Sequence, residues 1–475
     1  MNDRAEAVLA ILSHCEDVIS TQKSYDPEGR DTITIIQCRT LCDARVLTED
    51  VLPDLQRIYL FTRFSSGEAI ERAATIPLKE IESLNDAELA GQVLAGNVVL
   101  WFPRLGLGYS YHGGKRLARD TEESNIEVSI RGPKDGLVEN LMTNLGLIRQ
   151  RLPSPTVAFT SYTVGTKSKT RVGLMYCTDK LSPDTLSLIT SKLSALEQQI
   201  EELSSATQLE ELISDQPYSL FPLSVYTGRT DFITSSLLRG RFVILIDGVP
   251  GAIVAPATMT LLLKTAEDAH FNFISATSGR LLRLVSLYVS IFLPSFYIAL
   301  TGFHQDQLPF PLLSTISMTR VGVPFSVPVE MLLILLLMEV FREAGYRLPS
   351  SIGQTITVVG GLIIGDAAIR AGLTSPTIVV VAAVSVVAGS TLINQTLTGT
   401  VSVIRYFNLL LASVLGMYGF MLSCILVIVY IAGLTSYGIP YLSPLSPVNP
   451  KDVLRAVILL PRKWRGRKPE HLKRK

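Results

Sequence analysis

Asp366 and Arg370 are charged residues inside an otherwise apolar stretch, Ile352–Leu373. An ionisable side chain within a bilayer is costly, so it usually faces the interior of a helix bundle or a water-filled path. The chemistry that such residues offer is ion conduction, with Asp366 attracting cations. Steps of four, three, four and four residues place a set of five on one helical face. The candidate pore-lining residues on this face are Thr355, Val359, Leu362, Asp366 and Arg370.

Within this face Val359 and Leu362 would form an apolar gate. The alternative is structural. Asp366 and Arg370 lie four residues apart, a spacing at which opposite charges pair along one helix. Such a pair at the end of a helix near the membrane surface needs no role in conduction.

No catalytic motif is found elsewhere in the sequence. Gly106-x-Gly108 lacks the third glycine of a dinucleotide-binding loop, and Gly113-Gly114-Lys115 lacks the spacing of a phosphate-binding P-loop. The five histidines are isolated, and the five cysteines are scattered without the spacing of a zinc site. The sequence therefore predicts a protein that is not an enzyme, with no cofactor, no metal and reduced structural thiols.

The composition indicates that the candidate pore-lining face belongs to a group of membrane-spanning helices. The 475 residues include 43 basic and 42 acidic ones, so the net charge of +1 argues against a nucleic-acid binder that works by overall charge. Only 18% of residues are charged, against about 25% in an ordinary globular protein. Three runs without any charge are each about long enough to cross a bilayer as a helix. They are Leu284–Phe303, Thr374–Ile393 and Asn408–Leu434.

The sequence allows two alternative numbers of membrane spans. Pro328–Phe341 is shorter and carries Glu330 and Glu339, so it is either a re-entrant piece beside four spans or a further span among five or six. The N-terminal residues lack the apolar core of a signal peptide, which predicts a cytoplasmic first part. Residues 451–475 hold ten basic residues against two acidic ones, a net +8 that predicts a cytoplasmic C-terminal tail. This charge either sets the topology alone or also binds anionic membrane lipids.

The first half of the chain is typical of a soluble α/β region. Apolar residues recur on one stripe over Pro183–Leu203, which predicts a helix, and β-rich runs such as Val157–Thr163 and Arg171–Cys177 predict strands. Phe242–Leu263 is apolar enough to resemble a span, but Asp247–Gly248 predicts a hairpin turn there. We expect an α/β cytoplasmic N-terminal region with two subdomains, followed by an all-α polytopic transmembrane domain. The expected divisions are 1–120, 121–275, 276–447 and the basic tail 448–475.

Several motifs resemble the GerA family, the A subunits of spore germinant receptors. Glu127–Leu152 reads EVSIRGPKDGLVENLMTNLGLIRQRL, close to the family's RGP(R/K)(E/D)GF stretch followed by N..LIR.R. Further matches follow in chain order: QLEELISDQPYSLFP, GRFVILIDGVPGAIVAPAT, LPSFYIAL, REAGYRLP and GIPYLSPLSP. The first motif holds an exposed, turn-like stretch, Arg131–Gly136, which is either an interface or a structural corner, and it marks a candidate interface. Its residues are Arg131, Gly132, Pro133, Gly136, Asn144 and Arg149.

The sequence departs from the family pattern in the helical part. Val321 stands where the family usually has an acid after Arg320, and Asp366 and Arg370 stand where neutral amides are common. These departures concern the polarity of a pore and the choice of partner subunits.

The resemblance implies a function in spore germination. A member would lie in the spore inner membrane with both termini on the core side. It would assemble with a transporter-like B subunit that binds the nutrient, and with a lipoprotein C subunit. It would also form a homo-oligomer that conducts ions when the nutrient binds. The alternatives are the paralogous SpoVAF type, which amplifies the germination signal, and a secondary transporter, which usually shows more spans and internal repeats.

Overall fold

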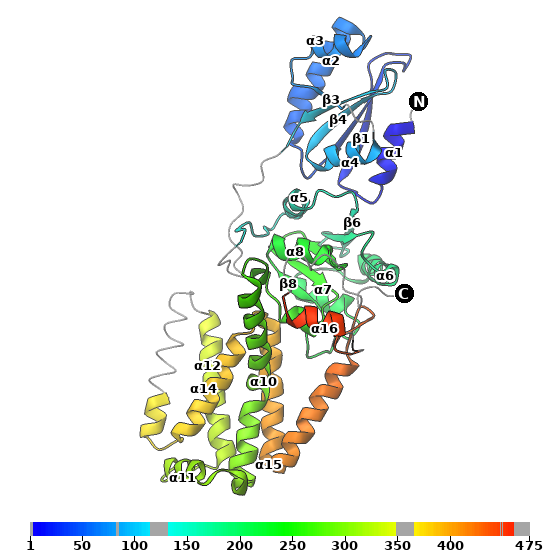
Figure 1. The fold of residues 1–475 in the computed structure, drawn as a ribbon. Coiled ribbons are helices and arrows are strands. Elements are labelled where there is room, and N and C mark those ends of the chain that lie inside the picture. Colours follow the sequence, from blue (N-terminus) through cyan, green and yellow to red (C-terminus); the bar gives the residue numbers. More distant parts are fainter. Residues whose placement is uncertain are drawn as a thin grey trace.

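The computed structural model describes residues 3–81, 85–114, 132–347, 365–446, 448 and 450–459. Figure 1 shows two α/β units stacked on a group of long helices. Each unit contains a five-stranded sheet, and every strand pair in both sheets is antiparallel. The predicted fold class, two α/β subdomains followed by a helical region, is therefore confirmed.

The first sheet has the strand order β1-β2-β4-β5-β3 and is covered by helices on both faces. Side chains alternate along β2: Ile33 and Ile35 pack with the α2–α3 side, whereas Ile36 and Cys38 pack with the α1–α4 side. The strands are β1 Val18–Ser24, β2 Thr32–Cys38, β3 Lys79–Glu80, β4 Asn97–Phe102 and β5 Leu107–His112. The helices are α1 Asp3–Ile11, η1 Val46–Val51, α2 Leu52–Thr62, α3 Gly67–Ala73 and α4 Asp86–Leu94.

The second sheet has the order β6-β7-β9-β10-β8 and joins the helical region through one of its faces. The face that carries Ile244 packs on α6 and α7, whereas the face that carries Val243 and Leu245 belongs to a core that continues into the long helices. The strands are β6 Val157–Val164, β7 Thr170–Cys177, β8 Val225–Thr227, β9 Phe242–Ile246 and β10 Ala252–Ala255. The helices are α5 Leu141–Arg151, α6 Pro183–Gln199, α7 Ala206–Ile213, α8 Thr230–Leu237 and α9 Met259–Leu262.

The apolar stretch Phe242–Leu263 is soluble structure, as its turn signal predicted. Strands β9 and β10 pair with Val243 opposite Val254, and the connection contains Gly248 with a positive φ of 86°. Both strands are buried within the second sheet, which explains why the stretch is apolar without crossing a membrane.

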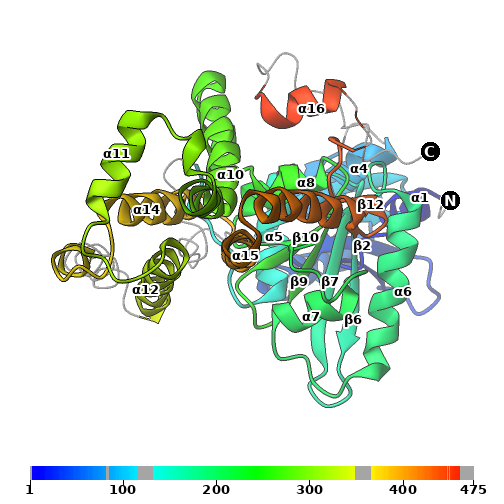
Figure 2. The same ribbon diagram turned by 90° about the horizontal axis from the view of Figure 1, so that it is seen from below.

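The helical region contains two helices long and apolar enough to cross a membrane among the described residues, α10 and α15. Helix α14 runs alongside α10 and α12, as the view in Figure 2 shows and as hydrogen bonds such as Tyr297–Thr377 require. Helix α12 extends the short run predicted at Pro328–Phe341 to 21 residues. The helices are η2 Ala266–Ala269, α10 Phe273–Phe303, η3 Gln305–Gln307, α11 Phe310–Thr319, α12 Val327–Arg347, α14 Pro376–Ser390, α15 Gln395–Gly433 and α16 Pro450–Val457, with strands β11 Thr435–Ser436 and β12 Ile439–Pro440.

Helix α15 is a hairpin of two helical arms, so the prediction of one continuous span over Asn408–Leu434 is wrong. Gly416 has φ 62° and ψ −137°, outside the helical region, and the chain reverses there (Figure 1). Thr400 donates a hydrogen bond to the carbonyl of Leu220, while the backbone N–H of Leu220 donates to the Tyr430 hydroxyl at 2.9 Å. A straight helix would hold Thr400 and Tyr430 about 45 Å apart. Both arms are apolar, so hydropathy alone does not reveal the turn.

The C-terminal helix α16 returns to the soluble end of the helices. The backbone N–H of Leu459 donates to Thr277 Oγ1 at 3.1 Å, and α16 lies beside α9 and the start of α10. The two sheets and α16 therefore lie on the same side of the helical region (Figure 1).

Candidate coupling site between the sheets and the helices

A buried ion pair joins the first sheet to the second. Asn140 caps α5, which directs Arg149 into the protein with no exposed side-chain surface. Its guanidinium donates to both oxygens of Asp17, at 2.8 and 3.1 Å, and to the carbonyl of Val157 at 2.8 Å. Burial by itself would lower the pKa of Arg149, but the charge of Asp17 raises it above its ordinary value. Asp17 precedes β1 and Val157 begins β6, so this pair fixes one sheet against the other.

The thiols in this region are free and buried. Burial raises the pKa of Cys38 to about 12 and that of Cys42 to about 11. Thiols with such pKa values remain protonated near neutral pH and do not react readily. Cys38 instead donates a hydrogen bond to Asp17 at 3.3 Å and belongs to the buried junction. The described residues contain no group of His, Cys, Asp and Glu side chains that could hold a metal ion.

The family-motif loop, residues 132–138, lies against Arg229. The carbonyl of Gly228 accepts from the N–H of Leu137 at 2.9 Å, and Gly136 forms a β-bridge with Arg229. Asn144 closes the loop from inside, because its amide bonds both the N–H and the carbonyl of Val138, at 2.8 and 2.6 Å. Pro133 lies in the same loop, whereas Arg131 lies outside the described residues. Asn144 and Arg149 are fully buried, so both side chains act within this chain.

Gly132 occupies a position that no other residue fills well. Its φ is +126°, and a Cβ there would lie 2.9 Å from His270 Nε2 and 3.1 Å from Arg229 Nη2. We expect Gly132→Ala to lower the unfolding free energy by about 1–3 kcal/mol through backbone strain and displacement of these side chains. Thermal unfolding of the purified chain measures the effect.

The matched control for that substitution is Gly106→Ala. Gly106 also has a positive φ, +67°, but nothing lies within 4 Å of its Cβ position. Its substitution reports backbone strain alone, about 1 kcal/mol. Equal losses of stability in the two variants would contradict a steric role for Gly132.

Arg229 is the centre of a charged cluster next to that loop. It is 4% exposed and donates to both oxygens of Asp231, at 3.1 and 2.8 Å, and to Glu267 at 2.6 Å. His270 contacts the same Asp231 carboxylate at 3.1 Å through Nε2. Burial by itself would raise the pKa of Asp231, but the hydrogen bond from Arg229 lowers it below its ordinary value. The cluster therefore holds η2, which carries Glu267, against α8, which carries Asp231.

Asp268, the residue after Glu267, is held by the long helix instead. It accepts from Arg280 Nε at 2.8 Å and from Arg283 Nη2 at 2.6 Å, and it closes a capping box with Thr265. Burial by itself would raise the pKa of Asp268, but hydrogen bonds from Arg283 and Arg280 lower it. Adjacent acids in η2 are thus bound in opposite directions, Glu267 to the second sheet's unit and Asp268 to α10. The turn therefore links the second sheet's unit to α10, so that a displacement of one would be transmitted to the other.

Charged side chains also lie between the long helices. Glu330 of α12 has no exposed surface and accepts from Arg320 at 2.9 Å and from the N–H of Ser375 at 3.0 Å. Glu339 accepts from Arg342 and from Arg405, the latter at 3.4 Å. Such side chains within an apolar region are usually functional or pair with each other. The sequence carried this signal in the acids of Pro328–Phe341, but only the structure identifies their partners.

The predicted pore-lining residues divide into two groups. Thr355, Val359 and Leu362 lie outside the described residues. Asp366 and Arg370 form an ion pair of 2.8 Å within the helical segment 365–370, with 57% and 79% of their side chains exposed. The expected spacing therefore produces the expected pair, and the side chains of Asp366 and Arg370 lie on the outside of this single chain.

Sequence patterns did not identify the coupling site, by which we mean the Asp17–Arg149 pair, the cluster around Arg229 and the pairs of Asp268. Asp17, Arg229, Glu267 and Asp268 are ordinary charged residues in local sequence, and Arg149 was a candidate only through its motif. The one available signal was the acidic pair Glu267-Asp268 followed by arginines at the start of an apolar run.

Comparisons with known proteins agree with the resemblance. The chain matches the family model described as Bacillus/Clostridium GerA spore germination protein over residues 6–471. It is 38% identical over 470 residues to spore germination protein XA of Bacillus anthracis, covering 98% of this chain and 95% of that protein. It is 30% identical over 449 residues to spore germination protein KA of Bacillus subtilis (strain 168), covering 94% and 81%.

A solved structure is also similar to the first half. It is the crystal structure of the N-terminal domain of the A subunit of the Bacillus megaterium spore germinant receptor GerK3. The match has 21% identity and a TM-score of 0.40, and covers 54% of this chain and 94% of that chain. The extent of the family match and the identity to curated relatives decide the assignment. The chain belongs to the GerA family of spore germination proteins, whose members are non-enzymatic membrane subunits, and it is an A subunit of a germinant receptor.

Proposed function

We propose that this A subunit forms a homo-oligomeric ion channel in the spore inner membrane, opened when a nutrient binds a partner subunit. The observation that carries the proposal is the set of charged side chains buried among the long helices, above all Glu330, which has no exposed surface. Ionisable side chains inside a membrane bundle are costly and commonly mark an ion path, which supports the proposal. The partners would be a transporter-like B subunit that binds the nutrient and a lipoprotein C subunit.

The arrangement of the ends supports one orientation in the membrane. The sheets and α16 lie on one side of the helices, and the basic tail follows α16 in sequence. Basic segments remain on the cytoplasmic side of a membrane, so both termini would face the spore core. The proposed domain divisions remain 1–120, 121–275, 276–447 and 448–475.

The coupling site supplies a route from the soluble region to the helices. Glu267 moves with the second sheet's unit through Arg229, and Asp268 moves with α10 through Arg280 and Arg283. A partner that shifts the soluble region would therefore shift the cytoplasmic end of α10.

Ion flux through the purified chain in lipid vesicles tests the channel. We expect Val359→Ala to increase the resting flux because it widens an apolar gate, and Asp366→Asn to reduce cation flux severalfold because it removes an attracting charge. Asp306→Asn is the control, since Asp306 is an exposed carboxylate at the opposite end of α10. Unchanged flux in both Val359→Ala and Asp366→Asn would reject these residues as pore-lining.

A further inference from the structure

Positive side chains gather where the second sheet's unit meets the start of α10. Two of them, Arg280 and Arg283, are paired with Asp268. Three more come from the turn between α8 and β9 and from the end of α9. They are Arg239, Arg241 and Lys264.

Arg241 has an unusual environment for a charged side chain. It is 4% exposed, and its Nε donates to the carbonyl of Pro256 at 3.1 Å. Its Nη1 is buried and has no hydrogen-bond partner within the described part of the chain. Burial, together with the charge of Arg239, lowers the pKa of Arg241 to about 9, so the guanidinium remains charged at neutral pH. A buried charge with an unmatched donor costs several kcal/mol unless an anion accompanies it.

Lys264 lies next to the same positive charges. It directly follows α9, is partly buried, and forms no hydrogen bond or ion pair through its ammonium group with any described residue. Burial lowers its pKa well below the ordinary value, and repulsion from Arg239, Arg280 and Arg241 lowers it further, against a smaller opposite effect of Asp268. Lys264 therefore has no anionic partner bonded to its side-chain nitrogen among the described residues, although three arginines lie around it.

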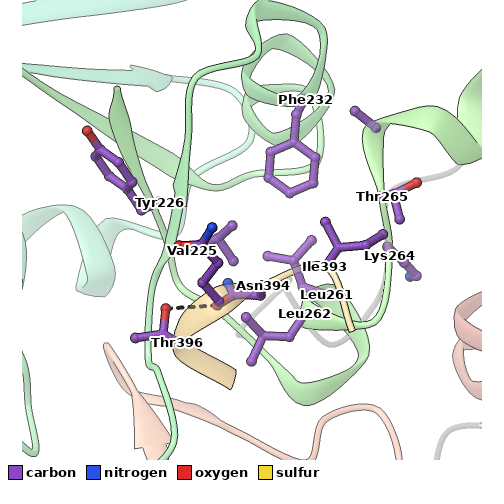
Figure 3. A pocket seen from close by; sticks show the side chains of 12 residues that line it. Val225, Tyr226, Phe232, Leu261, Leu262, Lys264, Thr265, Ile393, Asn394 and Thr396 are labelled. Atoms are coloured by element: carbon purple, nitrogen blue, oxygen red, sulfur yellow. Dashed lines mark hydrogen bonds between the residues drawn. The ribbon is translucent and has the colours of Figure 1, made fainter. Parts of the chain in front are cut away.

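The surroundings leave room for a ligand near Lys264. A cavity of about 120 Å³ lies between α8, α9 and the loop that precedes α15. Figure 3 shows Phe232 on one side of this cavity, Ile393, Asn394 and Thr396 on the other, and Lys264 at its edge. The site borders the end of the long helices, at the level where lipid headgroups would lie if α10 crosses the membrane.

We propose that Arg241 and Lys264 bind a phosphate group, carried either by an anionic phospholipid or by a free phosphate anion. A phosphate oxygen would accept from the unmatched Nη1 of Arg241, and arginine is well suited to such contacts because its donors are fixed in a plane. The bound anion would also offset the repulsion on Lys264. It would connect β9 and α9 with α10 beside the Asp268 pairs, and so strengthen the junction of the two regions.

Thermal unfolding of the purified full-length chain tests the site. In detergent, inorganic phosphate is titrated against sodium chloride of equal ionic strength. In lipid nanodiscs, phosphatidylglycerol is compared with phosphatidylcholine. The variants are Arg241→Gln, Arg241→Lys and Lys264→Gln. Arg72→Gln is the control, since it also removes one positive charge but lies on an exposed helix of the first unit, with 82% of its side chain exposed.

We expect phosphate or phosphatidylglycerol to raise the Tm of the wild type and of Arg72→Gln. Arg241→Gln and Lys264→Gln should need about tenfold more phosphate, or lose the lipid response, because each removes a basic side chain that donates hydrogen bonds to the anion. A phosphate response identifies the free anion as a ligand, and a response to phosphatidylglycerol alone identifies the lipid.

The Tm of each variant without ligand serves as the control for correct folding. Lys264→Gln should retain or exceed the wild-type Tm, because it removes a repelled cation, so it tests the site even if Arg241→Gln fails to fold. Arg241→Lys keeps the charge and should show an intermediate response. Equal responses in the wild type, Lys264→Gln and Arg72→Gln, or no response to either phosphate source, would overturn the proposal.

Discussion

Replacing Arg149 with methionine is expected to lower the unfolding free energy of the soluble region by about 3–5 kcal/mol. The substitution keeps much of the side-chain volume but leaves Asp17 as a buried carboxylate without its cation. Asp17 is 1% exposed, and its remaining contacts are the weak donor Cys38 Sγ and Thr40 Oγ1 at 3.3 and 3.2 Å. A buried charge that loses its partner destabilises a protein far more than an intact pair stabilises it. Because Arg149 also bonds the carbonyl of Val157, the two sheets should lose their fixed arrangement.

Thermal unfolding and limited proteolysis of the full-length chain measure this effect. The double variant Asp17→Asn/Arg149→Met removes both charges and should recover a large part of the lost stability. Arg72→Met is the control, because Arg72 pairs with Glu68 in an ion pair that is more than 80% exposed on both sides, and such pairs contribute little. Cleavage between the two sheets' units should increase only in Arg149→Met. A stability loss no greater than that of Arg72→Met would show that the pair does not join the units.

The same pair shows why sequence patterns predicted the elements but not their assembly. Alternation of apolar residues predicted strands such as Val157–Thr163, and the turn signal Asp247–Gly248 distinguished a buried hairpin from a membrane span. Each of these patterns depends only on residues that are neighbours in sequence. Asp17 and Arg149 are 132 residues apart, and no local pattern links them. The strand order also depends on long-range pairing, so an α/β composition did not reveal that both sheets are antiparallel.

In the helical part the limits of sequence patterns have another cause. Hydropathy shows how apolar a segment is but not whether its helix is straight. The two apolar arms on either side of Gly416 were therefore predicted as one span. The charges of Pro328–Phe341 were visible, but their meaning depended on Arg320 and Arg405, which come from other segments. The proposed pore face rests on spacing along one helix, and three of its five members, Thr355, Val359 and Leu362, lie outside the described residues.

Loss of the link through η2 should have the largest effect on germination itself. Asp268→Asn removes the carboxylate charge that Arg280 and Arg283 share and leaves one amide oxygen for two guanidinium groups, which weakens the tie between α10 and the turn that Arg229 holds. The bond from Arg283 to the carbonyl of Leu263 remains. A coupling free energy of about 1–3 kcal/mol corresponds to a change of about 5–150-fold. We therefore expect spores that carry Asp268→Asn as their sole copy of this subunit to germinate at least about tenfold more slowly with nutrient. The decrease in optical density of the spore suspension measures the rate.

The variants around the link separate coupling from folding. Arg229→Met should lower both the amount of protein and germination, because it leaves Asp231 and Glu267 buried without their cation. Glu267→Gln keeps an oxygen acceptor for Arg229, so it should leave the amount of protein unchanged and weaken germination less than Asp268→Asn. Glu211→Gln, an exposed acid on α7, should behave as wild type in both measurements. If Asp268→Asn spores contain normal amounts of the protein and germinate at the wild-type rate, η2 does not connect the soluble region to α10. The signal would then have to cross at another contact between the second sheet's unit and the helices, such as the hydrogen bonds of Leu220 with Thr400 and Tyr430.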